Sequence, residues 1–384
     1  MSATALGGQQ KMSQVVAKSL STFARLGTGA FDFAQGKLRS ALHNPWQPRL
    51  PRCCYIGCAL PLHEKALIAR IRRAAKRSGS PLDGGTGIGD DCAVIRIPRG
   101  HEALVTTDFS LENVHFRRGW HPPESVGHRC LARGLSDIAA MGGQPLAAFL
   151  SLALPRSLPQ GWVDGFLRGL LKLAADFKVS LAGGDTAQST AGILADIVVL
   201  GSVPKGRALL RSGARPGDRI YVTGELGGSA AVLKLLSRRG KIKPANFPRH
   251  FYPLPRVEAG RFLREKGLAS AMIDISDGLS TDLGHICEES GVGAEVDAMA
   301  IPVAAIGKPE REVDLRFALH GGEDYELLFT APRGSRVPAR IAGVAVRPIG
   351  HMTHARGVFL TDRNGVKREF AAKGWEHFKK EGTR

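Results

Sequence analysis

The feature that most constrains how this chain can fold is a short motif that recurs in five places. Each copy joins an apolar run to an aspartate with Gly, Ser or Thr beside it, and the copies read GIGDDCAVI, LVTTDFS, GLSDIAAMGG, LAGGDTA and MIDISDGLSTD. A single aspartate at the end of a strand usually caps a helix or forms a turn. Five such segments in one chain are hard to explain as caps alone, so the sequence predicts that the fold gathers carboxylates at one site.

These acids suit a site for metal ions and phosphate. Hard cations such as Mg²⁺ prefer oxygen ligands, and carboxylates brought together from several segments supply them. Glycines beside the acids allow backbone N–H groups to approach phosphates, and the hydroxyls of Thr106, Thr107 and Ser276 add further oxygens. The candidate aspartates are Asp90, Asp91, Asp108, Asp137, Asp185, Asp274 and Asp277.

Between the acidic motifs, helical and strand patterns alternate, which favours an α/β or α+β architecture. A turn is expected at 183–185, and the turn formers and arginines of 204–218 predict a domain boundary. The helix predicted at 63–77 would place on one face Leu67, Ile68, Ile71 and Ala75. Further helices are expected at 124–141, 158–177, 228–239, 256–266 and from about 278, and strands at 93–97, 103–108, 145–154, 179–182, 193–203, 219–224 and 272–276.

Composition excludes several classes of protein. The chain has 53 Lys and Arg against 35 Asp and Glu, a net charge of +18, but the surplus is diffuse and no basic stripe with interleaved aromatic residues occurs. A dedicated nucleic-acid binder is therefore not expected. No apolar run approaches the ~18 residues that cross a bilayer, so we expect a soluble protein without a membrane partner. The six cysteines form no CxxC pair, which favours a reducing compartment over a disulfide framework or a zinc site.

Residues 1–62 differ from the rest of the chain. They contain seven Lys and Arg and a single acid, Asp32, and prolines gather toward their end. A transit peptide has such a composition. The preferred interpretations are a start codon assigned too early, with Met12 as another candidate, or a disordered tail. Nothing in this stretch carries identifiable chemistry.

Several common nucleotide-binding and catalytic motifs are absent from the sequence. G-x-x-x-x-G-K-[ST] occurs nowhere, which excludes an ordinary P-loop. The GTGIG segment at 85–89 resembles half of a dinucleotide fingerprint, but it precedes a predicted strand instead of following one. Neither HRD nor DFG occurs, so a protein-kinase fold is excluded, and no G-x-S-x-G elbow supports Ser–His–Asp chemistry.

Nine motifs taken in order resemble the thiamine-monophosphate kinase family, within the aminoimidazole-ribonucleotide-synthetase-like (PurM-like) ATP-binding superfamily. They are GIGDDCAVI, TTDFSLENVHF, LSDIAAMGG, LAGGDT, GRALLRSGARPGD, VTGELGGSAA, IDISDGLSTDLGHI, GGEDYELLFT and GWEHF. The resemblance covers about residues 63–378. It implies an α+β fold of two domains: an N-terminal ATP- and Mg²⁺-binding domain over 63–205, preceded by the extension 1–62, and a C-terminal domain over 206–384.

The resemblance also implies an activity: ATP-dependent phosphorylation of thiamine monophosphate to thiamine diphosphate, assisted by several Mg²⁺ ions. Phosphoryl transfer needs mainly positioning and neutralisation of charge. Because the acceptor is an already ionised phosphate, a strong general base is unnecessary. A cytoplasmic homodimer is expected, in which an edge strand such as 145–154 finds cover in the partner.

Individual roles follow from the resemblance where residues match the family motifs. Positions that bind Mg²⁺ are Asp91, Thr106, Thr107, Asp108, Asp137, Asp185, Asp274 and Asp277. Positions that contact the nucleotide are Gly184, Asp185, Arg211 and Ser276, and those on the thiamine-phosphate side are His115, Glu323 and Trp375. Two positions depart from the family: Phe177 stands where relatives often have Tyr near the nucleotide, and Trp375 replaces a Tyr while keeping a face that can stack on a cation.

Other interpretations stay open at this stage. From the residues alone, His115 could be a surface turn residue, Glu323 a cap after two glycines, and Trp375 a core anchor. Neither Arg211 over Arg207 and Arg215, nor Asp91 over Asp90, can be chosen without the family. Selenophosphate synthetase and hydrogenase-maturation proteins share the expected fold, but their cysteine patterns have no match here. A non-catalytic nucleotide-binding or RNA-binding protein is the alternative from another class.

Overall fold

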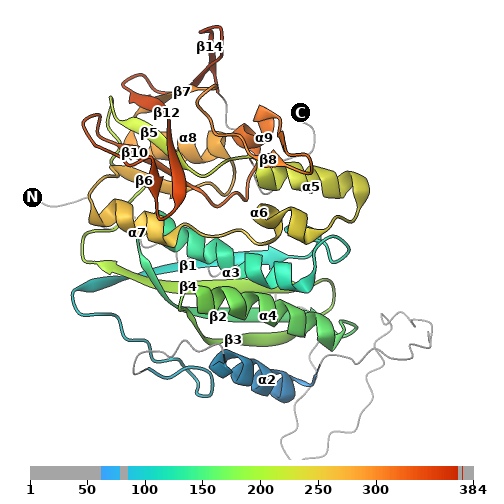
Figure 1. Ribbon diagram of the computed structural model, residues 1–384. Helices are drawn as coiled ribbons and strands as arrows, with labels where there is room; N and C mark the ends of the chain where they lie inside the picture. Colours follow the sequence, from blue (N-terminus) through green and yellow to red (C-terminus); the bar gives the residue numbers. More distant parts are fainter. Residues whose placement is uncertain (1–61, 78–84, 371–373, 375–384) are drawn as a thin grey trace, which may run out of the picture. The chain divides into compact units, whose positions relative to one another are not determined.

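Two mixed β-sheets organise the chain, each with its own set of helices (Figure 1). The computed structural model describes residues 62–77, 85–370 and 374. The first sheet uses strands within 101–204 and the second uses strands within 219–369. The expected architecture of mixed helices and sheets is confirmed.

The first sheet has the strand order β1–β4–β2–β3. β2 and β3 pair in parallel, and the other neighbouring pairs are antiparallel. β2 is therefore an interior strand, and the expectation that 145–154 forms an edge is wrong, because β4 and β3 pair with it on either side. The strands are β1 (His101–Leu111), β2 (Gln144–Pro155), β3 (Ser180–Ser189) and β4 (Leu194–Pro204).

The segment 183–185 lies inside β3, so the predicted turn is wrong as well. Gly184 has a φ of 142°, and a Cβ at this position would lie 1.8 Å from the carbonyl oxygen of Leu150 on β2. The register of the two strands shifts between Ala148 and Phe149, where the backbones come close together. The glycine is therefore required by the tight contact between two strands.

Near the beginning of the described chain, the predicted helix at 63–77 is confirmed, whereas the predicted position of Ile68 on its apolar face and the predicted strand at 93–97 are wrong. Helix α2 (Glu64–Arg77) buries Leu67 and Ile71. Ile68 is 39% exposed, because each residue turns the helix by about 100° and carries Ile68 off the stripe through Leu67 and Ile71. The predicted strand at 93–97 is reduced to an isolated bridge from Val94 to Thr86.

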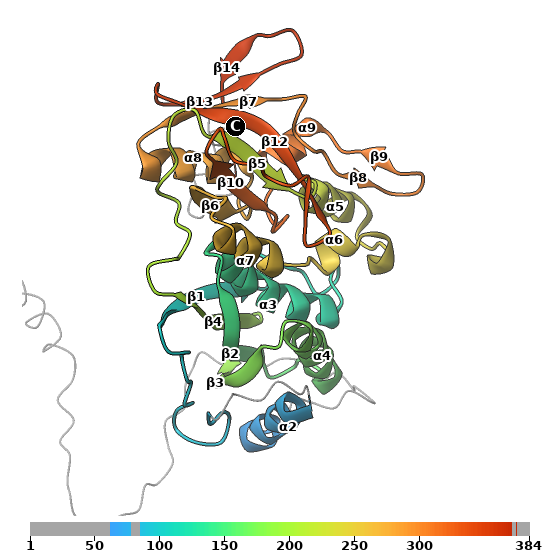
Figure 2. The ribbon, with the colours of Figure 1, turned by 60° about the vertical axis from the view of Figure 1, so that its left-hand side comes forward.

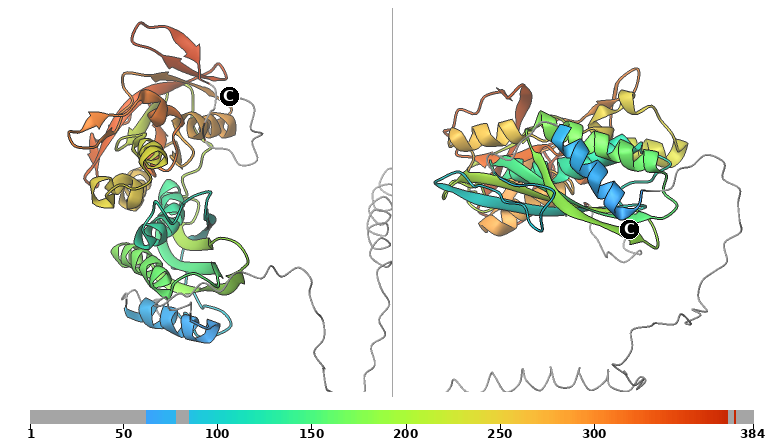
Figure 3. Two further views of the ribbon diagram at one scale, coloured as in Figure 1. Left: turned by 90° about the vertical axis from the view of Figure 1, so that its right-hand side faces the viewer. Right: turned by 90° about the horizontal axis from the view of Figure 1, so that it is seen from below.

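Two helices cover one face of the first sheet, and the ribbon views show them on the same side (Figure 3). They are α3 (Pro123–Ala140) and α4 (Gln160–Asp176). Glycines let the two helix backbones approach closely: a Cβ at Gly127 would lie 1.9 Å from the carbonyl oxygen of Phe166. No helix of the described chain covers the opposite face of this sheet.

Helix α3 is buried along nearly its whole length, including polar residues such as Arg129, Arg133 and Ser136. It packs on β1, β4 and α4 within the first layer, and it also contacts α7 (Val257–Glu265) and strand β6 (Ala271–Asp274). Figure 2 shows α7 directly above α3. The polar side chains of α3 are therefore held at the contact between the two halves of the chain.

The second sheet has the order β14–β13–β7–β12–β5–β10–β6, with β11 on β12. Helix α8 (Leu279–Ser290) packs on four strands of this sheet, which are β6, β7, β10 and β13. The predicted helix at 228–239 is confirmed as α5. Within the described chain, no helix is both long and apolar enough to cross a membrane. The remaining elements are β5 (Arg219–Thr223), α5 (Gly228–Arg239), a 3₁₀ turn (Pro244–Asn246), α6 (Pro248–Phe251), α8 (Leu279–Ser290), β7 (Gly293–Asp297), β8 (Ala305–Ile306), β9 (Arg311–Glu312), α9 (Leu315–His320), β10 (Leu327–Ala331), β11 (Arg340–Ile341), β12 (Val344–Thr353), β13 (Val358–Thr361) and β14 (Lys367–Glu369).

Candidate active site

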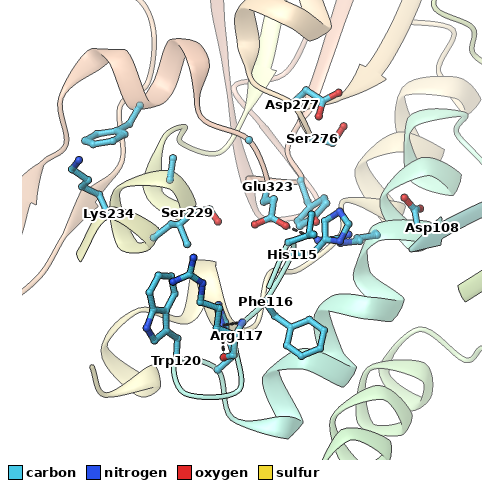
Figure 4. A pocket seen from close by; sticks show the side chains of 18 of the residues that line it. Asp108, His115, Phe116, Arg117, Trp120, Ser229, Lys234, Ser276, Asp277 and Glu323 are labelled. Carbon is cyan, nitrogen blue, oxygen red and sulfur yellow. Dashed lines mark hydrogen bonds and ion pairs between the residues drawn. The ribbon is translucent and has the colours of Figure 1, made fainter. Parts of the chain in front are cut away.

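A cavity of about 710 Å³ lies where both halves of the chain contribute side chains. Figure 4 shows Asp108 toward one end, Trp120 toward the other, and His115 and Glu323 between them. The lining side chains used in the arguments below are Asp108, His115, Arg117, Trp120, His121, Arg133, Asp137, Ser229, Leu233, Lys234, Asp274, Ser276, Asp277, Phe317 and Glu323.

Three predicted carboxylates meet at one end of the cavity. Asp108 comes from β1, Asp137 from the last turns of α3, and Asp274 from the end of β6. Thr106 donates a hydrogen bond to Asp137 Oδ2, and Ser136 donates one of 2.6 Å to Asp274 Oδ2. Local hydroxyls therefore hold the acids in place, and the two halves of the chain are joined at this cluster.

The carboxylates perturb one another strongly. Burial, together with the charge of Asp137, raises the pKa of Asp108 to about 7 and that of Asp274 to about 7. Burial also raises the pKa of Asp137, while the positive charge of Arg211 opposes the rise at Asp137 and Asp274. Repulsion between buried carboxylates of this kind is relieved by a divalent cation, and the all-oxygen donor set fits Mg²⁺.

Asp277 and Ser276, from the segment between β6 and α8, also line the cavity. Carboxylate oxygens of Asp277 and Asp282 and a ring nitrogen of His285 lie within 4.8 Å of one another. Asp282 Oδ2 already accepts hydrogen bonds from the backbone N–H groups of Asp277 (3.2 Å) and Gly278 (3.0 Å). Asp282 thus fixes the start of α8 and holds the backbone on which Asp277 is carried.

The other predicted ligands lie outside the lining of this cavity. Thr107 donates a 2.8 Å hydrogen bond to Asp196 Oδ1, because side chains alternate along β1 and its hydroxyl points to the opposite face from Thr106 and Asp108. Gly184 and Asp185 lie exposed on β3, at the far edge of the sheet from β1. The structure brings neither Thr107 nor Asp185 together with the three carboxylates.

Four further predicted positions are placed as follows. Asp91 is exposed on the loop before β1, as is Asp90. Arg211 is exposed, yet close enough for its charge to act on Asp137 and Asp274. Phe177 caps the C-terminal end of α4 and packs against the core of the first layer, away from the cavity. Trp375 lies outside the described residues.

Glu323 is an ion-pair partner and not a simple cap. Its carboxylate is bound by Arg129 and, at 2.6 Å, by Arg133, both from α3. Although burial alone would raise it, the charges of the two arginines hold the pKa of Glu323 well below its usual range. Glu323 also has a φ of 64°, a left-handed conformation that is uncommon for a non-glycine residue. The structure therefore fixes this carboxylate tightly in the cavity wall.

His115 lines the cavity on the segment after β1, and its Nδ1 accepts a 3.0 Å hydrogen bond from the backbone N–H of Leu111. This bond orients the ring and leaves the proton of the neutral imidazole on Nε2. His115 and Glu323 thus stand in the same cavity as the acids, between the acidic end and the apolar end (Figure 4).

Sequence reasoning missed the basic residues of α3. Arg129, Arg133 and Asp137 are spaced four residues apart, so they lie along one face of a helix that is otherwise apolar and buried. That spacing was the available signal, because arginine is seldom buried without a partner. At the far end of the cavity, Trp120 carried no comparable signal, and Ser229 lies within the family motif VTGELGGSAA without a role assigned to it.

The arrangement can hold cations and phosphates at one end and an organic group at the other. The acidic end is rich in oxygen donors, whereas Trp120, Leu233 and Phe317 give the opposite end an apolar wall. The guanidinium of Arg117 stacks on the Trp120 ring at 4.3 Å from its centroid. No cysteine is found among the side chains that line the cavity within the described chain.

Comparison with known proteins gives matches over most of the chain. Residues 89–203 match the AIR synthase related protein N-terminal domain, and residues 215–363 match the corresponding C-terminal domain. Thiamine-monophosphate kinase of Salmonella typhimurium is 40% identical over 328 residues, covering 82% of this chain and 98% of that protein.

Solved structures agree with these matches. A crystal structure of thiamine-monophosphate kinase from Stenotrophomonas maltophilia superposes with a TM-score of 0.67 at 35% identity, covering 77% of this chain and 95% of that one. AaThiL complexed with AMPPCP and TMP superposes with a TM-score of 0.64 at 30% identity, covering 82% and 97%.

Proposed function

The chain belongs to the thiamine-monophosphate kinase family, and we propose that it transfers the γ-phosphoryl group of ATP directly to the phosphate of thiamine monophosphate. The family activity is the conversion of thiamine monophosphate to thiamine diphosphate with ATP. The observation that carries the proposal is the convergence of Asp108, Asp137 and Asp274 at one end of a cavity whose other end is apolar. Two phosphate-bearing substrates would meet at the acidic end.

Magnesium ions are part of the proposal. Asp108, Asp137, Asp274 and Asp277 would hold them, with Thr106 supporting Asp137. When bound, the ions would neutralise charge on the phosphates and so stabilise the transition state. Arg211, whose charge reaches the same cluster, would add a further positive group. Asp91, Thr107, Gly184 and Asp185 remain proposed ligand or nucleotide positions from the family motifs.

The organic part of the acceptor would occupy the remainder of the cavity. Thiamine carries a cationic thiazolium and a flat aminopyrimidine, and the cavity offers His115, Glu323 and the apolar wall around Trp120. Glu323 is neutralised by two arginines, so it would act as a fixed hydrogen-bond acceptor more than as a free counter-charge. Trp375 stays a proposed contact on the same side.

The direct transfer can be tested by stereochemistry. With ATP made chiral at the γ-phosphorus by oxygen isotopes, a single in-line transfer inverts the configuration in thiamine diphosphate. Retention of configuration would require two transfers and a phosphoenzyme, and would overturn the proposal. Acid-quenched samples should contain no labelled protein that forms and decays during turnover.

We also propose that the protein forms a homodimer through the uncovered face of the first sheet. On β1, Val105 is 67% exposed and Phe109 is 56% exposed, on the face opposite α3. Exposed apolar side chains on a sheet face that no helix covers suit a surface at which a partner packs. A second copy would cover it by the same surface in a closed two-fold arrangement.

A further inference from the structure

A chain of hydrogen bonds reaches the cavity wall through two buried histidines. His121, on the segment before α3, has its Nε2 at 3.1 Å from Nε2 of His250 on α6. Nδ1 of His250 lies 2.9 Å from Oγ of Ser229, in the first turn of α5. His121 and Ser229 both line the cavity, and His250 is 1% exposed.

The backbone at Arg117 decides the direction of these hydrogen bonds. The Arg117 carbonyl already accepts two backbone N–H groups, from Trp120 and His121, each at 2.9 Å. His121 Nδ1 lies 3.2 Å from the Arg117 N–H and 3.3 Å from the Arg117 carbonyl oxygen. Because that carbonyl is already occupied, we assign Nδ1 as the acceptor of the Arg117 N–H. His121 therefore carries its proton on Nε2, since a neutral imidazole has one donor and one acceptor nitrogen.

The remaining protons follow from that assignment. We assign His121 Nε2–H as the donor to His250 Nε2, which also accepts from Arg129 Nη1 at 3.3 Å. The proton of His250 is then on Nδ1 and is donated to Ser229 Oγ. Both rings are neutral: burial and the charge of Arg129 lower the pKa of His121 to about 4 and that of His250 well below its ordinary value. The pair thus exists in one protonation state at neutral pH.

The consequence for Ser229 is that its oxygen accepts from His250, so its own proton does not point to that ring and can be donated to another group. Among the described residues, Ser229 Oγ has His250 as its single partner. The backbone N–H of Ser229 is bound separately, by Asp324 Oδ1 at 3.2 Å. The hydroxyl proton is therefore available to a ligand in the cavity that Ser229 lines.

We infer that Ser229 determines specificity by donating a hydrogen bond to a ring nitrogen of the aminopyrimidine of thiamine monophosphate, and that His250 positions it. The inference rests on the proposed function. The phosphate of the substrate belongs at the acidic end, and the thiazolium ring offers no neutral acceptor. In Figure 4 Ser229 lies on the side of Lys234 and Trp120, away from Asp108. The aminopyrimidine is the part of the substrate that brings an acceptor nitrogen there.

The test compares Ser229→Ala with Ser125→Ala, measuring the KM of each substrate, kcat and the melting temperature. Ser125 is also a buried serine, and its hydroxyl donates a 2.9 Å bond to the Phe251 carbonyl next to His250, outside the cavity. Loss of one neutral hydrogen bond should raise the KM for thiamine monophosphate about two- to tenfold in Ser229→Ala, with the KM for ATP unchanged. Ser125→Ala should leave both KM values unchanged.

His250 is tested by rescue. His250→Ala should raise the same KM about as much as Ser229→Ala, and the double variant should be no worse than the worse single one. His250→Asn keeps an amide N–H near the position of Nδ1 and should restore part of the affinity. If His250 only supports the fold, both histidine variants will lower the melting temperature and change the two KM values together, which would overturn its positioning role.

Binding calorimetry with thiamine monophosphate separates the inference from the function it rests on. A wild-type protein that fails to phosphorylate thiamine monophosphate would refute the proposed function. A Ser229→Ala protein that binds the substrate as tightly as wild type would refute the inference, whether or not turnover occurs. An analogue with C–H in place of the contacted ring nitrogen should bind wild type and Ser229→Ala equally.

Discussion

Ser136 Oγ donates a 2.6 Å hydrogen bond to Asp274 Oδ2, and this buried bond joins α3 of the first layer to β6 of the second sheet. The two residues are 138 positions apart in the chain. Because Asp274 carries a raised pKa of about 7 beside Asp137, the donor stabilises a carboxylate that burial and its neighbours destabilise. The cluster of Asp108, Asp137 and Asp274 is therefore complete only when both halves of the chain are packed together.

Ser136→Ala should lower the free energy of unfolding by about 1–3 kcal/mol, since it leaves a buried carboxylate oxygen without its donor. The Mg²⁺ concentration for half-maximal activity should rise as well. Urea unfolding and Mg²⁺ titration measure the two effects. The control is Ser189→Ala at the end of β3, which removes an exposed hydroxyl that accepts a hydrogen bond from the Ala191 N–H. An equal loss in both variants would contradict the prediction.

Mg²⁺ affinity should increase as the pH rises from about 6 to 8. Asp108 and Asp274 have pKa values of about 7 in the metal-free fold against an ordinary 3.8, so they hold protons that the ion must displace. Calorimetry in buffers of different ionisation enthalpy would count the protons released. An Mg²⁺ affinity that is independent of pH would contradict this.

The same two acids should affect the stability of the metal-free protein. Between pH 4 and 7 the folded state binds more protons than the unfolded chain, so Asp108 and Asp274 should make the free energy of unfolding fall as the pH rises.

Glu323→Gln should lower the free energy of unfolding by about 3–5 kcal/mol, because it leaves two buried arginine charges without their partner. Arg129 is 4% exposed and Arg133 is 9% exposed. Asp314→Asn is the matched control: it removes the charge from an exposed pair with Arg316 and keeps an N-cap side chain. The control should cost less than about 1 kcal/mol. A similar cost for both variants would show that the buried pairs contribute little.

Phe109→Asp should convert a dimer into a monomer, since a charge on the uncovered face of β1 would have to be buried without a partner. Light scattering at several protein concentrations measures the mass. Val366→Asp places the same charge at a residue that is 46% exposed between β13 and β14 and should leave the mass unchanged. A monomeric wild type that is active would refute the proposed dimer.

Gly184→Ala should prevent β3 from pairing normally with β2, because the added Cβ would meet the Leu150 carbonyl oxygen at 1.8 Å in a left-handed conformation. We expect a large loss of soluble, folded protein. Gly284→Ala, on α8 with open space around it, should instead gain about 0.5–1 kcal/mol from helix propensity. Equal stability of the two variants would contradict the assigned strand contact.

The sequence alone located most of the longer helices and named several of the chemical groups of the site. Helical periodicity located α5 at 228–239 and the α3 helix to within a residue or two, because such patterns are fixed by backbone geometry within a few residues. The aspartate motifs named Asp108, Asp137 and Asp274, which the cavity does bring together. The same motifs, read in order, also predicted the family and with it the α+β fold of two domains.

Only the tertiary structure decided which of those groups meet. Thr106 and Thr107 are neighbours in one motif, yet the alternation of β1 sends them to opposite faces. Glu323 pairs with Arg129 and Arg133 across 194 and 190 residues, and no local pattern encodes a contact of that separation. Such contacts depend on how the apolar faces of α3 and of the two sheets pack against each other, because that packing decides which polar groups lie side by side.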